Sequence, residues 1–269
     1  MKMVVVMIDK KEFLLQSIIR AYIEHLEPIG STQLKSMYDI TYSPATIRGY
    51  FKKLGEEGYL AQEHISSGRT PTTEALKQYW QTKLDFKLRG INLRALEYFA
   101  SNIGLSVFIK KEKSDVLKNI LNVEKKYMIL EFSSFAISVK YSDALYRFLN
   151  DMIGLDLKDI TRISKDVGAY EVYESINQTL QNSDFQIFNY KEFLTLALNY
   201  NFDEYTINKF LKGQILDELN EGLHFEKILP ADYIGICNYC KINNEDVKML
   251  VIGELPKDYE YFYEKITTF

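Results

Sequence analysis

Hydrophobic residues near the start of the chain recur every three or four positions, which is the spacing of one face of an α-helix. This pattern predicts a first helix over residues 10–25, carried by Phe13, Leu14, Ile18, Ala21 and Tyr22. Two shorter helices should follow, because serine is a favourable N-cap and a proline is well tolerated at the first helical position. The second covers residues 32–38 behind Ser31. The third follows Ser43 and ends near Gly58.

After the third predicted helix the pattern changes. Residues 59–63 favour a strand, residues 64–71 a loop with a glycine turn, and residues 74–86 a further helix that contains the only tryptophan, Trp80. Helix, short helix, turn, helix, strand and loop follow one another in the order of a winged helix-turn-helix. The pattern therefore predicts such a DNA-binding domain at residues 1–88.

The rest of the chain mixes strands with helices. Strand-like runs at residues 126–132 and 135–141 predict a hairpin, and residues 170–222 show mainly helical spacing. Two further strand-like runs, at residues 233–242 and 247–255, are separated by a short polar turn. Strands on both sides of a helical stretch favour one α/β domain that is interrupted by a helical insertion.

Length and composition indicate a globular protein of about two domains. Two cysteines in 269 residues are typical of a reducing, cytoplasmic compartment. The apolar run at residues 3–8 is too short for a signal peptide or a membrane span, so we expect no membrane segment. Residues 1–89 hold 13 lysines and arginines against 10 acidic residues, whereas the remainder holds 20 against 27. A basic module joined to an acidic one fits DNA binding confined to one end.

The third predicted helix carries suitable side chains at its N-terminal end, where a recognition helix meets the bases. Arg48 can grip guanine with two hydrogen bonds, and Ala45 is small enough to approach a thymine methyl group. Nearby hydroxyl groups can bond phosphates or bases, and two lysines extend the positive surface toward the DNA backbone. An ordinary capped surface helix would also show a serine followed by a proline, so this segment alone leaves both interpretations open.

The loop at residues 64–71 is the second candidate element, a wing. Arg69 beside Gly68 suits a loop tip that reaches into a minor groove or onto phosphate, and the serine hydroxyls of the loop suit phosphate. A plain hairpin is the alternative. The complete set of expected DNA contacts is Ser31, Thr32, Ser43, Ala45, Thr46, Arg48, Tyr50, Lys52, Lys53, His64, Ser66, Gly68 and Arg69.

Four short motifs stand in one order along the N-terminal part of the chain: EPIGS at 27–31, SPATIR at 43–48, EGYL at 57–60 and HISSGRTPT at 64–72. Through these motifs and their spacing, residues 10–85 closely resemble the heat-inducible transcription repressor HrcA family. Weaker similarity continues at residues 99–104, which look like the start of that family's GAF-like domain, and at residues 251–259, near its C-terminus.

The resemblance implies a dimeric repressor of chaperone operons that binds an inverted-repeat operator and is supported by the GroEL chaperonin. Unfolded proteins that occupy the chaperonin would then derepress the chaperone genes. The implied fold class is α+β, with a GAF-like domain at residues 92–165 and 223–269 and a mainly helical dimerising insertion at residues 166–222. Operator DNA, a second copy and GroEL are the expected partners. We expect no cofactor, no metal and no enzymatic activity.

The chain departs from the family after Arg48. The family usually has Asn-Asp-Met there, whereas this chain has Gly49, Tyr50 and Phe51. Glycine weakens a helix by roughly 0.5–1 kcal/mol relative to alanine. The missing asparagine removes a possible adenine contact, so the operator can differ or Tyr50 can take over a contact. The chain is also shorter than typical members, which points to a trimmed insertion or GAF-like part.

Two other functions remain open on the sequence. The GAF-like domain could bind a small effector, for which a polar-lined cavity would be the distinguishing feature. Alternatively, the winged helix could dock a protein, in which case Arg48 and Arg69 need not matter. Cys237 and Cys240 form a Cys-x-x-Cys motif, but an offset of three residues places the two thiols on opposite faces of a strand. We therefore expect neither a zinc site nor a redox pair there.

Overall fold

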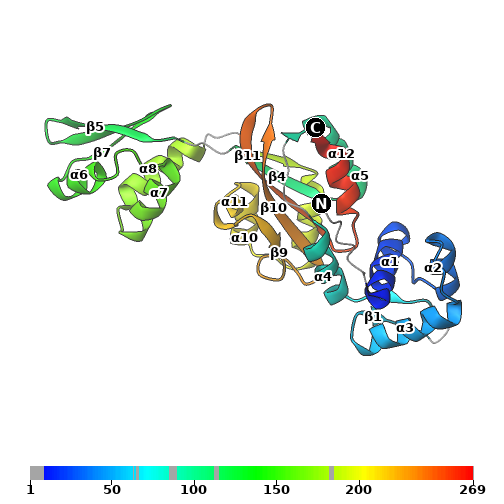
Figure 1. Cartoon of the computed structure of the whole chain (residues 1–269). Coiled ribbons are helices and arrows are strands. Elements are labelled where there is room, and N and C mark those ends of the chain that lie inside the picture. The colour runs from blue at the N-terminus through cyan, green and yellow to red at the C-terminus, as the bar shows by residue number, and fades with distance from the viewer. Residues whose placement is uncertain are drawn as a thin grey trace, which may run out of the picture. The chain divides into compact units, whose positions relative to one another are not determined.

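A computed structural model describes residues 9–62, 64, 67–84, 90–111, 115–181 and 185–268. The fold is mixed α+β, with helices and sheets distributed along the whole chain (Figure 1). Its contacts divide it into two compact units. The larger unit comprises Met1–Ile109, Ile187–Asn244 and Lys248–Phe269, and the smaller comprises Lys110–Gln186 and Glu245–Val247. Among the described residues, no helix is long and apolar enough to cross a bilayer.

The larger unit begins with three helices and a short hairpin. Side-chain caps fix where two of the helices start: Asp9 accepts from the Lys11 amide before α1, and Ser43 accepts from the Thr46 amide before α3. The helices enclose an apolar core that includes Leu14, Ile18, Leu34, Ile47, Phe51 and Leu54. The predicted helices are confirmed to within a few residues. Their bounds, with the hairpin strands, are α1 Lys10–His25, α2 Ser31–Met37, α3 Pro44–Glu56, β1 Leu60–Ala61, β2 Thr70–Pro71 and α4 Thr73–Lys83.

A second part of the larger unit is built on one sheet, in which the strand order is β12-β3-β10-β11-β4-β8, and β9 pairs with β10. The turn between β10 and β11 has positive φ at Asn243 and Asn244, as a tight two-residue hairpin requires. The predicted strand pair near the C-terminus is therefore confirmed. The strands are β3 Gly90–Ile91, β4 Ser106–Lys111, β8 Phe185–Phe188, β9 Gly222–His224, β10 Tyr233–Ile242, β11 Glu245–Glu254 and β12 Thr267–Thr268.

Helices cover both faces of this sheet (Figure 1). On one face α5 packs against α12, the last helix of the chain. On the other face, the rings of Phe193 of α9 and Phe210 of α10 lie 5.4 and 5.7 Å from the ring of Phe108 of β4, between centroids, and 4.6 Å from each other. All three rings are buried, so these helices belong to the core of the larger unit. The helices are α5 Leu93–Ile103, α9 Tyr190–Asn199, α10 Glu204–Leu211, α11 Ile215–Glu218 and α12 Tyr259–Ile266.

The smaller unit is a three-stranded antiparallel sheet with helices on one face (Figure 1). Residues along β7 alternate between exposed and buried, which is the pattern of a sheet covered on one side only. Its core joins Leu130 and Val139 of the sheet to Leu149, Ile160 and Ile176 of the helices. The elements are β5 Leu117–Val123, β6 Tyr127–Phe132, β7 Ala136–Lys140, α6 Asp143–Asn150, α7 Leu157–Asp166 and α8 Tyr170–Gln181.

The division into units differs from the one expected from the sequence. The insertion was placed at residues 166–222, but the compact inserted unit spans residues 110–186. Two sets of contacts explain the difference. Residues 187–222 bury Phe193 and Phe210 in the larger unit, whereas the predicted hairpin at 126–141 is part of the sheet of the smaller one.

Candidate nucleic-acid interface

Helix α3 has one face buried and one face uncovered. Ile47, Phe51 and Leu54 lie on the buried face, in the core of the three-helix segment. Ala45, Arg48 and Lys52 are exposed, and their spacing of three and four residues places them together on the other face. Three of the residues expected to contact DNA are thus side by side on a solvent-facing helix surface.

The start of α3 is fixed by a local hydrogen-bond pair. The Ser43 hydroxyl oxygen accepts from the Thr46 amide at 3.1 Å and lies 2.9 Å from the Thr46 hydroxyl. Both side chains are exposed, but each already has a partner within the chain. Ser43 and Thr46 therefore serve first to hold the end of the helix, and a DNA contact would use their remaining hydrogen-bonding capacity.

Arg48 connects α3 to α2. Its Nη1 donates to the Ser31 hydroxyl at 3.3 Å, and Ser31 is the first residue of α2. The neighbouring Thr32 is exposed at the same helix end. The structure thus brings Ser31, Thr32 and Arg48 together, although Arg48 is 16 and more positions away from the other two in the sequence.

The other polar residues of α3 are arranged less favourably for base contact. Tyr50 is half-buried, packs against the core and lies 5.8 Å from the Lys53 ammonium, measured to its ring centroid. Lys52 is 3.9 Å from Glu56 across one helical turn, a weak exposed pair that costs little to break. Lys52 and Lys53 are both exposed and free to turn toward a phosphate.

The hairpin after α3 differs from the expected wing. Arg69 exchanges backbone hydrogen bonds of 2.9 Å with Ile29, so it lies at the base of the loop and is half-buried. A Cβ on Gly68 would stand 2.6 Å from the backbone of Pro28 and Ile29, so glycine is required there by close packing. Placing Gly68 and Arg69 at the loop tip was therefore wrong, while a DNA contact by Arg69 stays a prediction.

The outer part of the loop is described only in part. His64 is exposed, and its backbone is tied to Ser67, whose hydroxyl donates to the His64 carbonyl at 2.7 Å. Ser66, which was expected to contact phosphate, lies outside the described residues.

Gly49 was already named from the sequence, which does not show its surroundings, and Lys10 was missed. Gly49 is exposed between Arg48 and Lys52, and a Cβ there would meet nothing within 4 Å. Lys10, at the start of α1, lies 5.6 Å from the ring of Tyr42 in the turn before α3, which adds an exposed positive charge near the helix end. No local signal links Lys10 to Tyr42, because they are far apart in the sequence.

Comparisons with known proteins identify the family of this chain. A family model described as the HrcA C-terminal domain matches residues 80–269. The heat-inducible transcription repressor HrcA of Helicobacter pylori strain J99 is 32% identical over 97% of this chain and 95% of its own length. The chain belongs to the HrcA family. The HrcA of Helicobacter pylori strain 26695 is 33% identical over the same shares of the two chains.

One solved structure, of a hypothetical protein, covers 96% of each chain at 18% identity with a TM-score of 0.49. That likeness is too remote to place a site. The two HrcA relatives, by contrast, extend through the N-terminal helices, since they match nearly the whole chain. The chain is therefore related to heat-inducible transcription repressors over 97% of its length.

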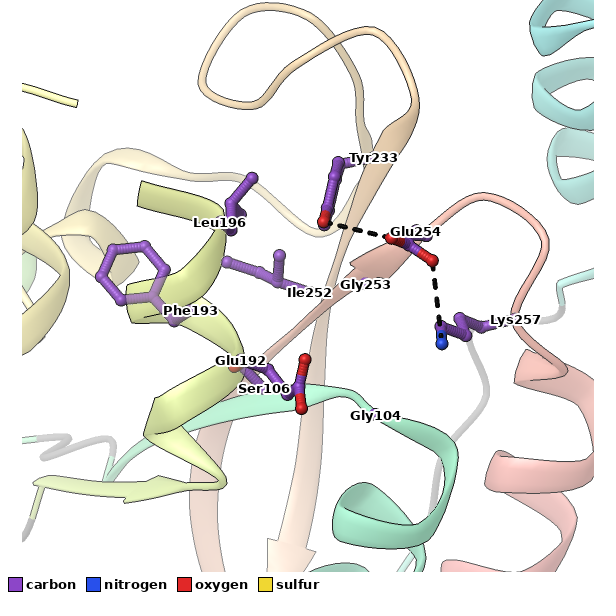
Figure 2. A pocket seen from close by; sticks show the side chains of 10 residues that line it. All are labelled: Gly104, Ser106, Glu192, Phe193, Leu196, Tyr233, Ile252, Gly253, Glu254 and Lys257. Atoms are coloured by element: carbon purple, nitrogen blue, oxygen red, sulfur yellow. Dashed lines mark hydrogen bonds and ion pairs between the residues drawn. The ribbon is translucent and has the colours of Figure 1, made fainter. Parts of the chain in front are cut away.

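In this HrcA family member, a small polar cavity lies behind the end of β11 (Figure 2). The Glu254 carboxylate accepts from the Tyr233 hydroxyl at 3.4 Å and is 3.7 Å from the Lys257 ammonium. Burial and this carboxylate raise the pKa of Tyr233. The cavity measures about 40 Å³. Small-molecule sites usually need roughly 300 Å³ or more, so this cavity does not favour the effector-binding alternative.

The two cysteines lie on β10, and both are buried. Burial raises the pKa of Cys237 to about 11 and that of Cys240 to about 12. Thiolates are the reactive and metal-binding form, and such high pKa values disfavour them at neutral pH. Within the described residues, no group of three metal-binding side chains is found.

Proposed function

We propose that this chain is a transcription repressor that binds an inverted-repeat operator as a dimer. The segment from α1 to α4 is the winged helix-turn-helix, and α3 is its recognition helix in the major groove. The observation that carries the proposal is the uncovered face of α3, where Arg48 stands exposed between Ala45 and Lys52 and beside the start of α2. Family membership supports the same assignment.

The contacts divide by role. Arg48 reads a base, because its guanidinium can form two hydrogen bonds to guanine. The exposed lysines Lys10, Lys52 and Lys53 neutralise phosphates, which gives affinity without sequence preference. Tyr50 supports Lys53 from the edge of the core rather than reading a base.

We propose that the sheet of the larger unit is the GAF-like domain and that residues 110–186 are the dimerising insertion. The outer face of its three-stranded sheet supports this role. Leu121, Val123 and Tyr127 are 42%, 40% and 51% exposed there, on two paired strands. A cluster of exposed apolar side chains on an uncovered sheet face is typical of an interaction site, and a two-fold dimer would cover both copies of it at once.

Repression is further proposed to respond to the GroEL chaperonin. The support is the family resemblance alone: chaperonin that is engaged with unfolded protein is no longer free to assist the repressor. Operator affinity should then rise with free chaperonin and fall when a non-native protein competes for it.

A gel-shift titration tests these proposals together. The probe is the promoter of the host's chaperone operon, the competitor is scrambled DNA, and each titration is run with and without GroEL. Selective binding that tightens with GroEL is the expected result. Selective binding that ignores GroEL would contradict the chaperonin link alone, and equal binding to operator and scrambled DNA would contradict the repressor assignment.

A further inference from the structure

Trp80, the only tryptophan of the chain, joins α4 to the sheet-based part of the larger unit. Its side chain is completely buried, and its indole N–H donates to the Leu255 carbonyl at 2.7 Å. The indole ring stands edge-to-face on Tyr259, with centroids 5.1 Å apart. The indole donates its one hydrogen bond to a backbone carbonyl 175 residues away in the sequence. Because the indole is also buried, this contact fixes the position and orientation of α4 relative to the end of β11.

The turn after β11 is shaped to receive this indole. The Tyr259 hydroxyl donates to the Glu254 carbonyl at 2.9 Å and so closes the turn. A Cβ on Gly253 would lie 2.7 Å from that hydroxyl and 2.4 Å from Leu105, so a side chain there would displace Tyr259. Gly253 and Glu254 at the end of β11 and Lys257 of the turn also line the small cavity of Figure 2.

Polar contacts surround the buried indole. Glu260 of α12 accepts from the Tyr79 hydroxyl at 3.1 Å and is 3.6 Å from Nη1 of Arg20 on α1. Lys77 of α4 is paired with Glu226, and its ammonium lies 5.9 Å from the ring of the adjacent Phe225. Both α1 and α4 are therefore tied to the sheet-based part by hydrogen bonds and ion pairs.

These contacts extend to the recognition helix through packed side chains. Arg20 lies on the helix whose Leu14 and Ile18 pack in one core with Ile47 of α3. An orientation imposed at Trp80 and Glu260 is therefore passed to α3, because close-packed interiors transmit displacement.

We propose that the contacts of Trp80 and Glu260 form a joint that fixes the direction of α3, so that two copies fit both halves of an inverted repeat. This inference rests on the proposed function. Half-sites read by helix-turn-helix dimers lie one helical turn, ~34 Å, or a multiple of it apart. If the segment that carries α3 were loosely tethered, it would lose orientational entropy when the second half-site is bound. With a fixed joint that entropy is already lost in the free protein, so binding of the second half-site costs less free energy.

The test uses the full chain and two glutamates of α12. Glu260→Ala removes the partner of Tyr79 and Arg20. Glu264→Ala is the matched control, because within the described part of the chain Glu264 forms an ion pair only with the adjacent Lys265, and both residues belong to α12. Two quantities are measured: acrylamide quenching of the Trp80 fluorescence, and affinity for the inverted repeat and for a single half-site. Far-ultraviolet circular dichroism checks that each variant is folded.

For Glu260→Ala we expect Trp80 quenching to rise about twofold, because the joint opens more often. Inverted-repeat affinity should fall about tenfold while half-site affinity stays within about twofold, the signature of lost pre-orientation. Glu264→Ala should change neither. Equal losses on both DNAs, or an intact preference for the inverted repeat despite raised quenching, would overturn the joint. A wild-type chain without preference for the inverted repeat would instead overturn the proposed function, and the joint with it.

Discussion

Helix α3, the proposed recognition helix, and the sheet of the smaller unit each have one buried face and one uncovered face. On α3 the uncovered face carries Arg48 and Lys52 around the bare backbone of Gly49. On the sheet it carries Leu121, Val123 and Tyr127. Binding of a polyanion to a solvated cationic face is favourable because counterions are released. Binding to exposed apolar side chains is favourable because they are removed from water. The two surfaces therefore require partners of different chemistry.

This difference in surface chemistry assigns dimerisation and DNA binding to separate parts of the molecule. If the sheet holds the second copy and α3 holds the DNA, damage to one surface should spare the primary function of the other. Variants of each surface test this assignment when dimer dissociation and DNA affinity are both measured for each variant.

The largest effect is expected from the pair Leu121→Lys and Val123→Lys. In a two-fold interface the pair places four lysines opposite one another, and like charges at an interface cost several kcal/mol. The dissociation constant of the dimer should rise by about 100-fold or more. Analytical ultracentrifugation measures it. Half-site affinity should remain unchanged, because α3 is untouched.

Asn150→Lys is the control for that pair. Asn150 is exposed at the end of α6, which covers the opposite, buried face of the sheet. The control adds positive charge to the same unit but away from the outer sheet face, so its dimer should persist. If the double variant stayed dimeric as well, the second copy would have to be held elsewhere.

Arg48→Ala should cost about 1–3 kcal/mol in operator binding and relax the sequence preference, since a bidentate contact to guanine is lost. The dimer should persist. Lys53→Ala is the comparison on the same helix: its loss should be similar for every DNA sequence and should lower the salt dependence by about one phosphate contact. Titrations on operator and random DNA at several salt concentrations measure both. Equal losses of Arg48→Ala on the two DNAs would reduce Arg48 to a phosphate contact.

The sequence was most informative where structure depends on neighbours in the chain. The start of α3 was predicted closely, because the Ser43 cap and Pro44 each act within one helical turn. Ser31 as the N-cap of α2 was wrong: Gly30 is the N-cap, and its amide donates to the Gln33 side chain, so α2 begins one residue earlier than expected. The repressor family was recognised from motifs in the same region.

It was least informative where distant segments meet. Arg69 was expected at a loop tip, yet its backbone pairs with Ile29. Residues 187–222 were assigned to the insertion, because their helical spacing does not reveal that Phe193 and Phe210 pack on Phe108. The contact of Arg48 with Ser31 likewise depends on how two helices pack. The spacing of apolar residues in a single sequence shows which face of a helix or strand is buried, but it does not show which other segment covers that face.

Acid should weaken the inserted unit through Asp115, which is buried and accepts from the amides of Val116, Ser133 and Ser134 and from the Ser134 hydroxyl. Burial raises the pKa of Asp115, but these hydrogen bonds outweigh it and lower the pKa to about 2. Because the folded pKa lies below the unfolded value, the carboxylate stabilises the unit above about pH 4 and loses that effect as the pH falls toward 2.

The contribution is about 2 kcal/mol at neutral pH, from a shift of nearly two pKa units at about 1.4 kcal/mol each. Asp115→Asn should remove most of it and flatten the acid limb of the unfolding curve, followed by circular dichroism between pH 2 and 7. An unchanged acid limb would contradict the role of Asp115. Operator binding to a half-site should be unaffected by Asp115→Asn at neutral pH, which again separates the two regions.

The smallest effect is expected from Gly49→Ala. The added methyl group would meet nothing within 4 Å, so its main consequence is to restrict the unfolded chain and favour the helix. The free energy of unfolding should rise by about 0.5–1 kcal/mol, and operator affinity should stay within about twofold. Denaturant unfolding and the operator titration measure the two quantities on one preparation. A variant that gained stability but lost more than about tenfold in operator affinity would show that DNA lies against the Gly49 backbone. The uncovered face of α3 would then be specialised for close approach as well as for charge.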